Sequence, residues 1–163
     1  MLLKTVFASL LPFVATACAG ATPSPPGLSF LYSLNCTLSA SIPVGAGPHG
    51  TRVVIPITGG TFSGPKLKGK VLNLGADWGL VDKDGVFSAD TRYQLQTDDG
   101  ADIFIRTSGP AQADGHLHLR IVFETGNANY YWLNNIVAVG ILTSGDGYVL
   151  IDAWQLESPK GKK

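Results

Sequence analysis

Four polar residues of this chain are candidates for catalysis: Asp77, Arg92, His118 and Asn134. A carboxylate or an imidazole can move a proton, and an arginine can stabilise negative charge that develops on oxygen. Histidine is the side-chain type that ordinarily titrates near neutrality, so His118 is either a general acid/base or an ordinary exposed histidine. Asn134 lies among apolar residues, where an amide suits recognition of a carbonyl group. The residue types favour chemistry on a small molecule that carries a carbonyl.

Large rings accompany these polar residues and predict the wall of a binding cavity. Trp78 follows Asp77, and Tyr93 follows Arg92. The predicted substrate-binding residues are Trp78, Tyr93, Glu124, Trp132 and Trp154. Structural alternatives exist for two of the catalytic candidates. Asp77 can cap a turn, and Arg92 can form an ion pair with a carboxylate or lie in solvent.

Metal and cofactor motifs are weak or absent in the sequence. His116 and His118 lie two residues apart, as zinc ligands on one face of a strand do, but no third ligand is evident. We therefore predict no metal. The chain has no G-x-S-x-G elbow, no P-loop and no G-x-G-x-x-G that follows a strand and precedes a helix, so no cofactor is predicted.

The elements that must position these residues are β-strands. Residues 28–38 and 116–125 alternate apolar with small or polar side chains, and Gly-rich turns recur between such runs. Nine strands are expected, at 28–38, 52–58, 66–74, 78–81, 86–97, 102–107, 116–125, 130–143 and 148–156, with 42–50 as a loop. The pattern predicts an all-β, antiparallel up-and-down barrel of the calycin or lipocalin type, as a single domain over 28–157. A β-sandwich is the alternative.

Composition limits the partners. The chain has 163 residues, of which 45% are hydrophobic and 15% charged, and its formal net charge is zero. A neutral chain gives no reason to expect nucleic acid as a partner. The expected partner is a hydrophobic small molecule, and a homodimer is the alternative to a monomer.

The chain ends predict a secretory route. Residues 1–19 read as a signal peptide, with cleavage after Ala17 or Ala19, followed by a Pro-rich linker at 20–27. A buried N-terminal helix and a lipid anchor at Cys18 are the alternatives. No integral membrane segment is expected after cleavage. Asn35-Cys36-Thr37 is a glycosylation sequon, and 158–163 is a basic tail.

Short motifs in a fixed order resemble the DUF3237 family, also called UPF0311. They are GGTFSGP at 59–65, GADW at 75–78, Arg92-Tyr93, TDDG at 97–100, Glu124-Thr125 and the segment 132–134. The resemblance implies a calycin-like barrel and no single assigned reaction. With the signal peptide and sequon, the chain looks like a fungal, secretory-pathway branch. In architecture it is similar to fungal pericyclases of secondary metabolism, including hetero-Diels–Alderases.

Three functions follow as hypotheses. The first is a cofactor-independent enzyme of natural-product biosynthesis that directs a pericyclic cyclisation, such as an intermolecular hetero-Diels–Alder reaction, by holding a reactive intermediate. The second is a non-catalytic, lipocalin-like carrier. The third is an acid/base isomerase or lyase that uses Asp77, His118 or Glu124.

Overall fold

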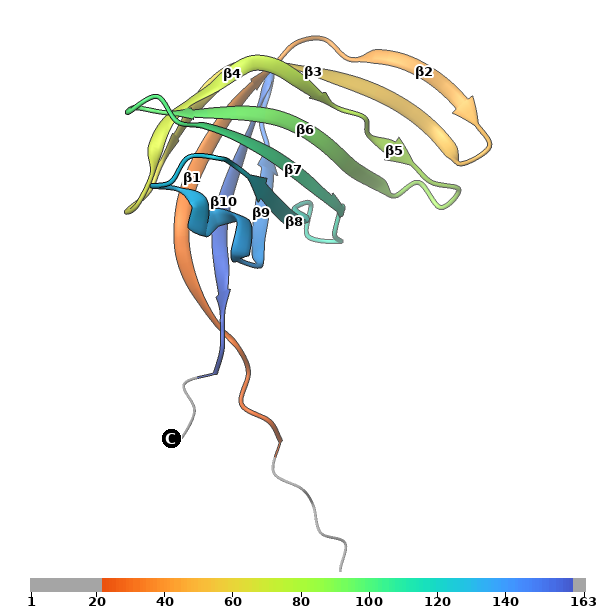
Figure 1. The fold of residues 1–163 in the computed structure, drawn as a ribbon. Helices are drawn as coiled ribbons and strands as arrows, with labels where there is room; N and C mark the ends of the chain where they lie inside the picture. Colours follow the sequence, from red (N-terminus) through yellow and green to blue (C-terminus); the bar gives the residue numbers. More distant parts are fainter. Residues whose placement is uncertain (1–21, 160–163) are drawn as a thin grey trace, which may run out of the picture.

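The computed structural model describes residues 22–159, which form ten strands and one short 3-10 helix (Figure 1). The elements are β1 (Gly27–Leu38), β2 (Ile42–Gly47), β3 (Gly50–Ser63), β4 (Lys68–Asp77), β5 (Leu80–Val81), β6 (Phe87–Thr97), β7 (Asp102–Pro110), β8 (Leu117–Glu124), η1 (Tyr131–Asn135), β9 (Ala138–Ser144) and β10 (Tyr148–Glu157).

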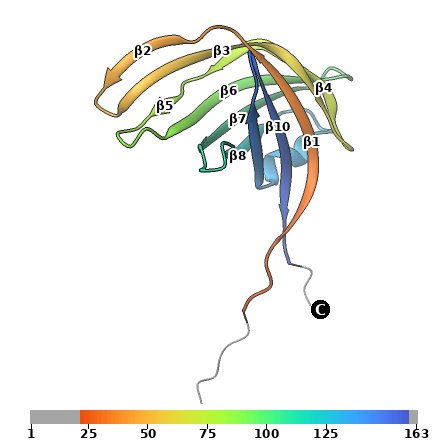
Figure 2. The same cartoon turned by 180° about the vertical axis from the view of Figure 1, so that it is seen from behind.

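The strands form one closed antiparallel barrel of eight strands, which confirms the predicted fold class. The order around the barrel is β1-β10-β9-β8-β7-β6-β4-β3, and pairing of β1 with β3 closes it. Hairpin β2–β3 and the short β5 extend the wall beyond the barrel, and the outer ends of β1 and β10 run side by side away from it (Figures 1 and 2). Each long strand therefore pairs with its neighbours in sequence, as an up-and-down barrel requires.

Side chains alternate between the lumen and the outer surface along the wall. On β8, Leu117, Leu119, Ile121 and Phe123 are buried, whereas the intervening residues are exposed. On β6, the buried set is Ala89, Thr91, Tyr93, Leu95 and Thr97. Successive strand residues point to opposite faces, so Arg92 and Tyr93 must lie on opposite sides of the wall.

One end of the lumen is filled by aromatic and aliphatic side chains. Tyr32 packs edge-on against Phe62 and Phe123, with ring centroids 5.7 and 6.2 Å apart. Helix η1 covers this end and contributes Leu133, which is buried. The packed end anchors the barrel by burial of apolar area.

The structure corrects two predicted elements. Residues 130–143 are not one long strand, because η1 occupies 131–135 and β9 begins only at Ala138. The Asn134 amide bonds the main chain of Thr125 and Tyr131, which favours a turn over a strand. Residues 42–50 are not a loop, because β2 pairs with β3 as a hairpin.

The predicted signal peptide, residues 1–19, lies outside the described residues, as do parts of the linker and of the basic tail. Between residues 22 and 159, no helix has the length and apolar character needed to cross a membrane.

Closure of the barrel depends on Gly60, and this gives a first prediction. Gly60 has φ 139° in an irregular stretch of β3, and a Cβ there would overlap the carbonyl oxygen of Asn35 on β1. We expect Gly60→Ala to lower the free energy of unfolding by roughly 2–4 kcal/mol, from backbone strain and overpacking. Urea denaturation followed by tryptophan fluorescence measures this change.

Gly126→Ala is the matched control, because a Cβ at Gly126 meets nothing within 4 Å. The control should stay within about 0.5 kcal/mol of the wild type. Equal stability of the two variants would contradict the role given to Gly60.

Candidate functional site

A cavity of about 170 Å³ occupies the lumen at the end opposite η1. All eight barrel strands contribute to its walls, which are mainly apolar. They include Leu38, Ile55, Ile57, Leu117, Leu142 and Ile151. A concave apolar site with a few polar groups is the usual form of a small-molecule site.

Asp77 provides the carboxyl group of this cavity. Around the cavity, within residues 22–159, it is the only Asp, Glu, Lys, Arg or His. It is the last residue of β4 and pairs with Ile55 on one side and Thr91 on the other, all with inward-facing side chains. The strand register thus carries a carboxylate into an otherwise apolar lumen.

The surroundings of Asp77 favour its protonated form. Burial raises the pKa of the Asp77 carboxyl above its ordinary value, and the nearby Asp90 charge acts in the same direction. Hydrogen bonds from the Asp90 amide, at 2.9 Å, and from the Thr91 hydroxyl hold the side chain and partly offset the rise in pKa. A carboxyl with a raised pKa that faces a cavity is a candidate for proton transfer.

Tyr93 and Cys36 bring two further polar groups to the cavity wall. The Tyr93 hydroxyl is buried and has no hydrogen-bond partner within residues 22–159. Burial raises the pKa of this phenol well above its ordinary value, so it is neutral. Burial also raises the pKa of the Cys36 thiol to about 12, so Cys36 is not a thiolate nucleophile at neutral pH.

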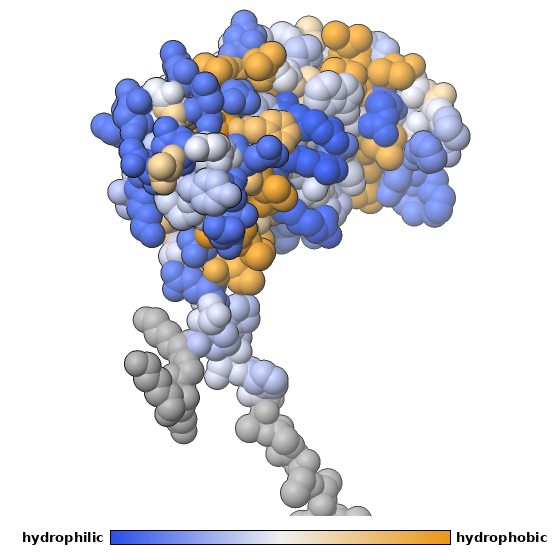
Figure 3. Space-filling model, viewed as in Figure 1, coloured by the Kyte–Doolittle hydropathy of each residue, from blue (hydrophilic) through white to orange (hydrophobic). Residues whose placement is uncertain are grey.

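Aromatic rings stand at the outer part of the cavity. Phe87 packs over Gly79, and Tyr148 packs over Gly145 with 38% of its surface exposed. The nearby hairpin β2–β3 exposes Ile42 and Val44, and Figure 3 shows hydrophobic colouring at the upper right, where this hairpin lies in Figure 1. The approach to the cavity is therefore apolar on this side.

Arg92 and Trp78 lie on the outer face of the wall. The Arg92 guanidinium is 5.9 Å from the centre of the Trp78 ring and 3.4 Å from Asp90 Oδ1. Asp90 also contacts Arg106 of β7 at 3.4 Å. These charges are partly exposed and form a surface network, so Arg92 is not brought to Asp77 in the lumen.

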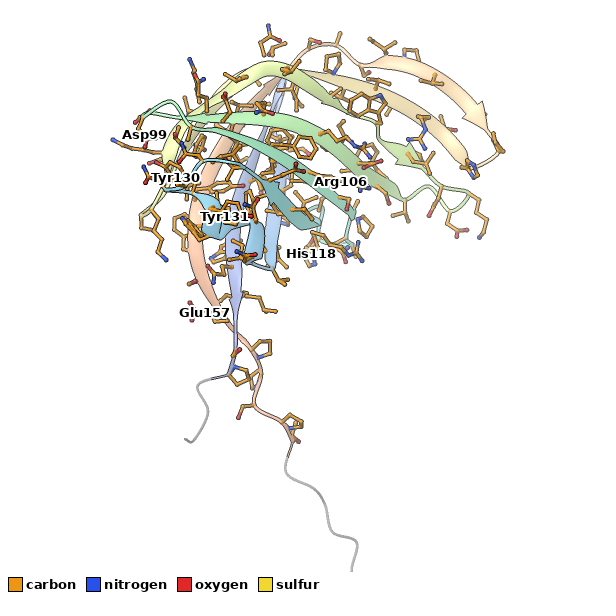
Figure 4. The ribbon with its side chains drawn as sticks, viewed as in Figure 1. Asp99, Arg106, His118, Tyr130, Tyr131 and Glu157 are labelled. Atoms are coloured by element: carbon orange, nitrogen blue, oxygen red, sulfur yellow. The ribbon has the colours of Figure 1, made fainter. Side chains whose placement is uncertain are left out.

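His118 and Glu124 also face outward from β8, where both are exposed. Figure 4 labels His118 on β8 and Arg106 on the neighbouring β7, where Arg106 pairs with Val122 and not with His118. Trp154 lies on the outer face of β10, with its ring 6.2 Å from that of Phe30. The residues that line the cavity do not include His118, Glu124 or Trp154.

Trp132 and Asn134 belong to η1 at the packed end. Lys66 lies over the Trp132 ring at 5.3 Å, and Asn134 is committed to main-chain hydrogen bonds. Close by, the Tyr130 hydroxyl donates to Asp99 at 3.0 Å, and Figure 4 shows the two side chains together. Asn134 therefore holds η1 in place.

The structure brings two predicted site residues, Asp77 and Tyr93, to the cavity and places the others elsewhere. The roles of all of them stay predictions. Sequence reasoning missed Cys36, Thr91 and Phe87. The alternation that groups Cys36 with Leu34 and Tyr32, and Thr91 with Tyr93, was the signal that points to the lumen.

Two other predictions concern glycosylation and metal binding. Asn35 of the sequon is exposed on β1, and its glycosylation stays a prediction. In the part of the chain that the structure describes, no group of three His, Cys, Asp or Glu side chains lies close enough to hold a metal ion.

The barrel and its sequence match known proteins. The family model described as "Protein of unknown function (DUF3237)" matches residues 26–156. A curated relative, the hydroalkoxylation enzyme phnH of Penicillium herquei, is 31% identical over 94% of this chain and 98% of its own length. A UPF0311 protein of Rhodopseudomonas palustris is 31% identical over 80% of this chain and 98% of its own.

A solved structure confirms the architecture. The chain is similar to a β-barrel-like protein of Acinetobacter baumannii, with a TM-score of 0.79, 37% identity, and coverage of 85% of this chain and all of that one. Since the family model spans nearly the whole barrel, the chain belongs to the DUF3237 family, as its motifs predicted.

Proposed function

We propose that this chain is a cofactor-independent enzyme that adds a hydroxyl group across a carbon–carbon double bond of an apolar small molecule held in the lumen. The observation that carries the proposal is Asp77, a carboxyl with a raised pKa in an apolar cavity. Similarity to a fungal hydroalkoxylation enzyme supports the reaction class, and it supports a place in natural-product biosynthesis.

The reaction needs only a movable proton. The Asp77 carboxylate accepts the proton of the substrate hydroxyl while the oxygen forms a bond to one alkene carbon. The π electrons move toward the other carbon, and Asp77 returns the proton there. Reactant and product are isomers, so neither an oxidant nor a reductant is consumed. General base catalysis of this kind contributes typically 10²–10⁴-fold to the rate.

The cavity contributes by holding the substrate in a reactive geometry. An intramolecular addition needs the hydroxyl oxygen and the alkene carbon held about 3–3.5 Å apart. Aliphatic walls built from Ile55, Ile57 and Leu142 exclude water and restrict the folded conformation of an apolar chain. Water that entered the lumen would compete with the hydroxyl as the nucleophile.

Other functions use the same cavity without the carboxyl. A pericyclic cyclisation, including the predicted hetero-Diels–Alder reaction, requires orientation but no proton transfer. A carrier requires neither. The dependence of turnover on Asp77 and on pH therefore separates the three functions.

The kinetic prediction uses a simple probe, 2-hydroxyphenyl propenyl ketone, whose phenol adds to the conjugated double bond to give 2-methylchroman-4-one. We expect Asp77→Asn to lower kcat about 10²- to 10⁴-fold, because the amide cannot accept the proton. The wild-type rate should fall as the pH drops through the raised pKa of Asp77, above the ordinary 3.8. Chiral chromatography of the product measures both rate and stereochemistry.

Asp146→Asn is the matched control, because Asp146 is an exposed carboxylate in the β9–β10 turn. It should keep the wild-type rate. A wild type that does not exceed the buffer rate, or an Asp77→Asn variant with the full rate, contradicts the proposed reaction. A full rate with a flat pH profile would show that the cavity accelerates the addition by holding the probe, without proton transfer by Asp77.

Asp77→Asn should lower kcat, but it should also raise the free energy of unfolding relative to the wild type as the pH rises. Since the pKa of Asp77 is raised in the folded state, protonation stabilises the fold fully below the unfolded pKa, and this stabilisation is lost as the pH rises through the folded pKa. Asn keeps the oxygen that accepts from the Asp90 amide and does not titrate.

We therefore expect Asp77→Asn to gain stability relative to the wild type as the pH rises across that window. The gain is about 1.4 kcal/mol for each pH unit between the folded and unfolded pKa values. Urea denaturation at several pH values measures the difference. A difference that is constant with pH, or one that shrinks as the pH rises, contradicts the raised pKa.

A further inference from the structure

We propose that the ligand extends out of the lumen, with a ring inside the cavity and an aliphatic chain on the inner face of hairpin β2–β3 and β5. The inference deepens the function proposed above and rests on it for the reaction at the ring end. It specifies the substrate class as an uncharged ring compound that carries an aliphatic chain.

The first observation is the size of the cavity, which is about 170 Å³. An apolar cavity of about 150 Å³ takes up a single benzene ring, whereas small-molecule sites typically span about 300–1,000 Å³ and enclose most of the ligand. One substituted ring therefore fills this cavity. A larger substrate needs a second apolar surface outside the lumen.

The second observation is that the cavity wall continues beyond the barrel on the same face of β3. Ile55 and Ile57 line the cavity, and the alternation of side chains places Thr51 and Val53 on the face of Ile55. Figure 1 shows this part of β3 running on with β2 and β5 as a curved continuation of the wall. An apolar surface therefore leads from the lumen onto the hairpin.

Pairing with β2 and β5 widens this surface. Thr51 pairs with Ala46 of β2 and with Val81 of β5, and Val53 pairs with Pro43. Paired residues share a face of the sheet. We call this face the extension trough, and its side chains are Pro43, Ala46, Thr51, Val53 and Val81.

The third observation is that the trough is uncharged and uncovered. None of its five side chains is an Asp, Glu, Lys, Arg or His. The one arginine of this stretch, Arg52, lies on the opposite face and donates to the Trp78 carbonyl oxygen at 2.6 Å. No side chain in residues 42–47 or 50–56 is buried, so no second layer of the described chain packs there. Such an apolar face suits an aliphatic chain.

Phe87 stands where the cavity meets the trough. Its ring lines the cavity and packs over Gly79, where a side chain would overlap it. Phe87 also pairs with Val81 of the trough. A chain that leaves the lumen along this wall therefore contacts Phe87 first and Val81 next. The four residue steps from Ile55 to Thr51 span about 13 Å, which sets the length of chain that the trough can hold.

A pair of 4-alkylphenols tests the trough by binding alone. 4-Methylphenol is a ring of the size that the cavity holds, and 4-hexylphenol adds five methylene groups. We expect the wild type to bind 4-hexylphenol about 30-fold more tightly by calorimetry, because each methylene on a one-sided apolar wall is half-buried and gains about twofold. The methyl NMR signals of Val53 and Val81 should shift with 4-hexylphenol and stay fixed with 4-methylphenol.

Val53→Asp puts a charge in the trough and should reduce the preference to below about 3-fold, with the affinity for 4-methylphenol unchanged. Val54→Asp is the matched control, because Val54 is the next residue of β3, is also half-buried and lies on the opposite face. It should keep the full preference. Val53→Thr keeps the branched shape and should lower the preference about threefold, and it replaces Val53→Asp if that variant no longer binds 4-methylphenol.

A full preference in the Val53 variants overturns the trough, and so does a wild type that binds the two phenols equally. An equal loss in Val54→Asp also overturns it, because the effect would not belong to the inner face. The two proposals fail separately. Cyclisation that depends on Asp77, without any preference for the longer phenol, would keep the proposed reaction and remove the trough. The preference without Asp77-dependent cyclisation would keep the trough and remove the reaction.

Discussion

Pairing of β1 with β3 is the constraint on which the structure depends. It joins the two ends of the curled sheet, so the barrel has no free edge between these strands. Closure also fixes the register, and a shift of one residue would move every side chain of a strand to the opposite face. Asp77 and Tyr93 are in the lumen and Arg92 is outside because this register is fixed.

The two ends of the lumen are filled differently, and this difference separates stability from function. Tyr32, Phe62, Phe123 and Leu133 pack the end covered by η1. At the other end, burial of the Asp77 carboxyl opposes folding. Such local conflicts are expected where a protein binds or transforms a ligand, since the rest of the fold supplies the stability.

The sequence predicted the barrel because alternation is clear where one face is fully buried. Leu117 to Phe123 on β8 is an example. It failed at η1, where the apolar run around Trp132 resembles a strand. The hydrogen bonds of Asn134 to the main chain of Thr125 and Tyr131, which bend the chain, leave no mark on the apolar pattern. It failed again at β2, because Pro and Gly residues indicate a loop unless a partner strand is known.

The site was only partly predictable. Asp77 and Tyr93 were identified, but Arg92, His118 and Glu124 were given equal weight. A sequence does not distinguish polar side chains on the lumen face of a strand from those on its outer face. Which side chains point into the lumen depends on how the strand pairs with strands that are distant in sequence. The sequence allowed Arg92 to be a buried hydrogen-bond donor. In the structure, its guanidinium contacts the Trp78 ring and Asp90 on the outer surface.

The central claim is that an apolar small molecule binds inside the barrel and not on its surface. The direct measurement is a methyl NMR titration with chromone. The account predicts that the methyl signals of Ile55, Ile57, Leu142 and Ile151 shift together, while those of Leu74 and Val122 on the outer face stay fixed. Shifts confined to Leu74, beside the surface ring of Trp78, would contradict it.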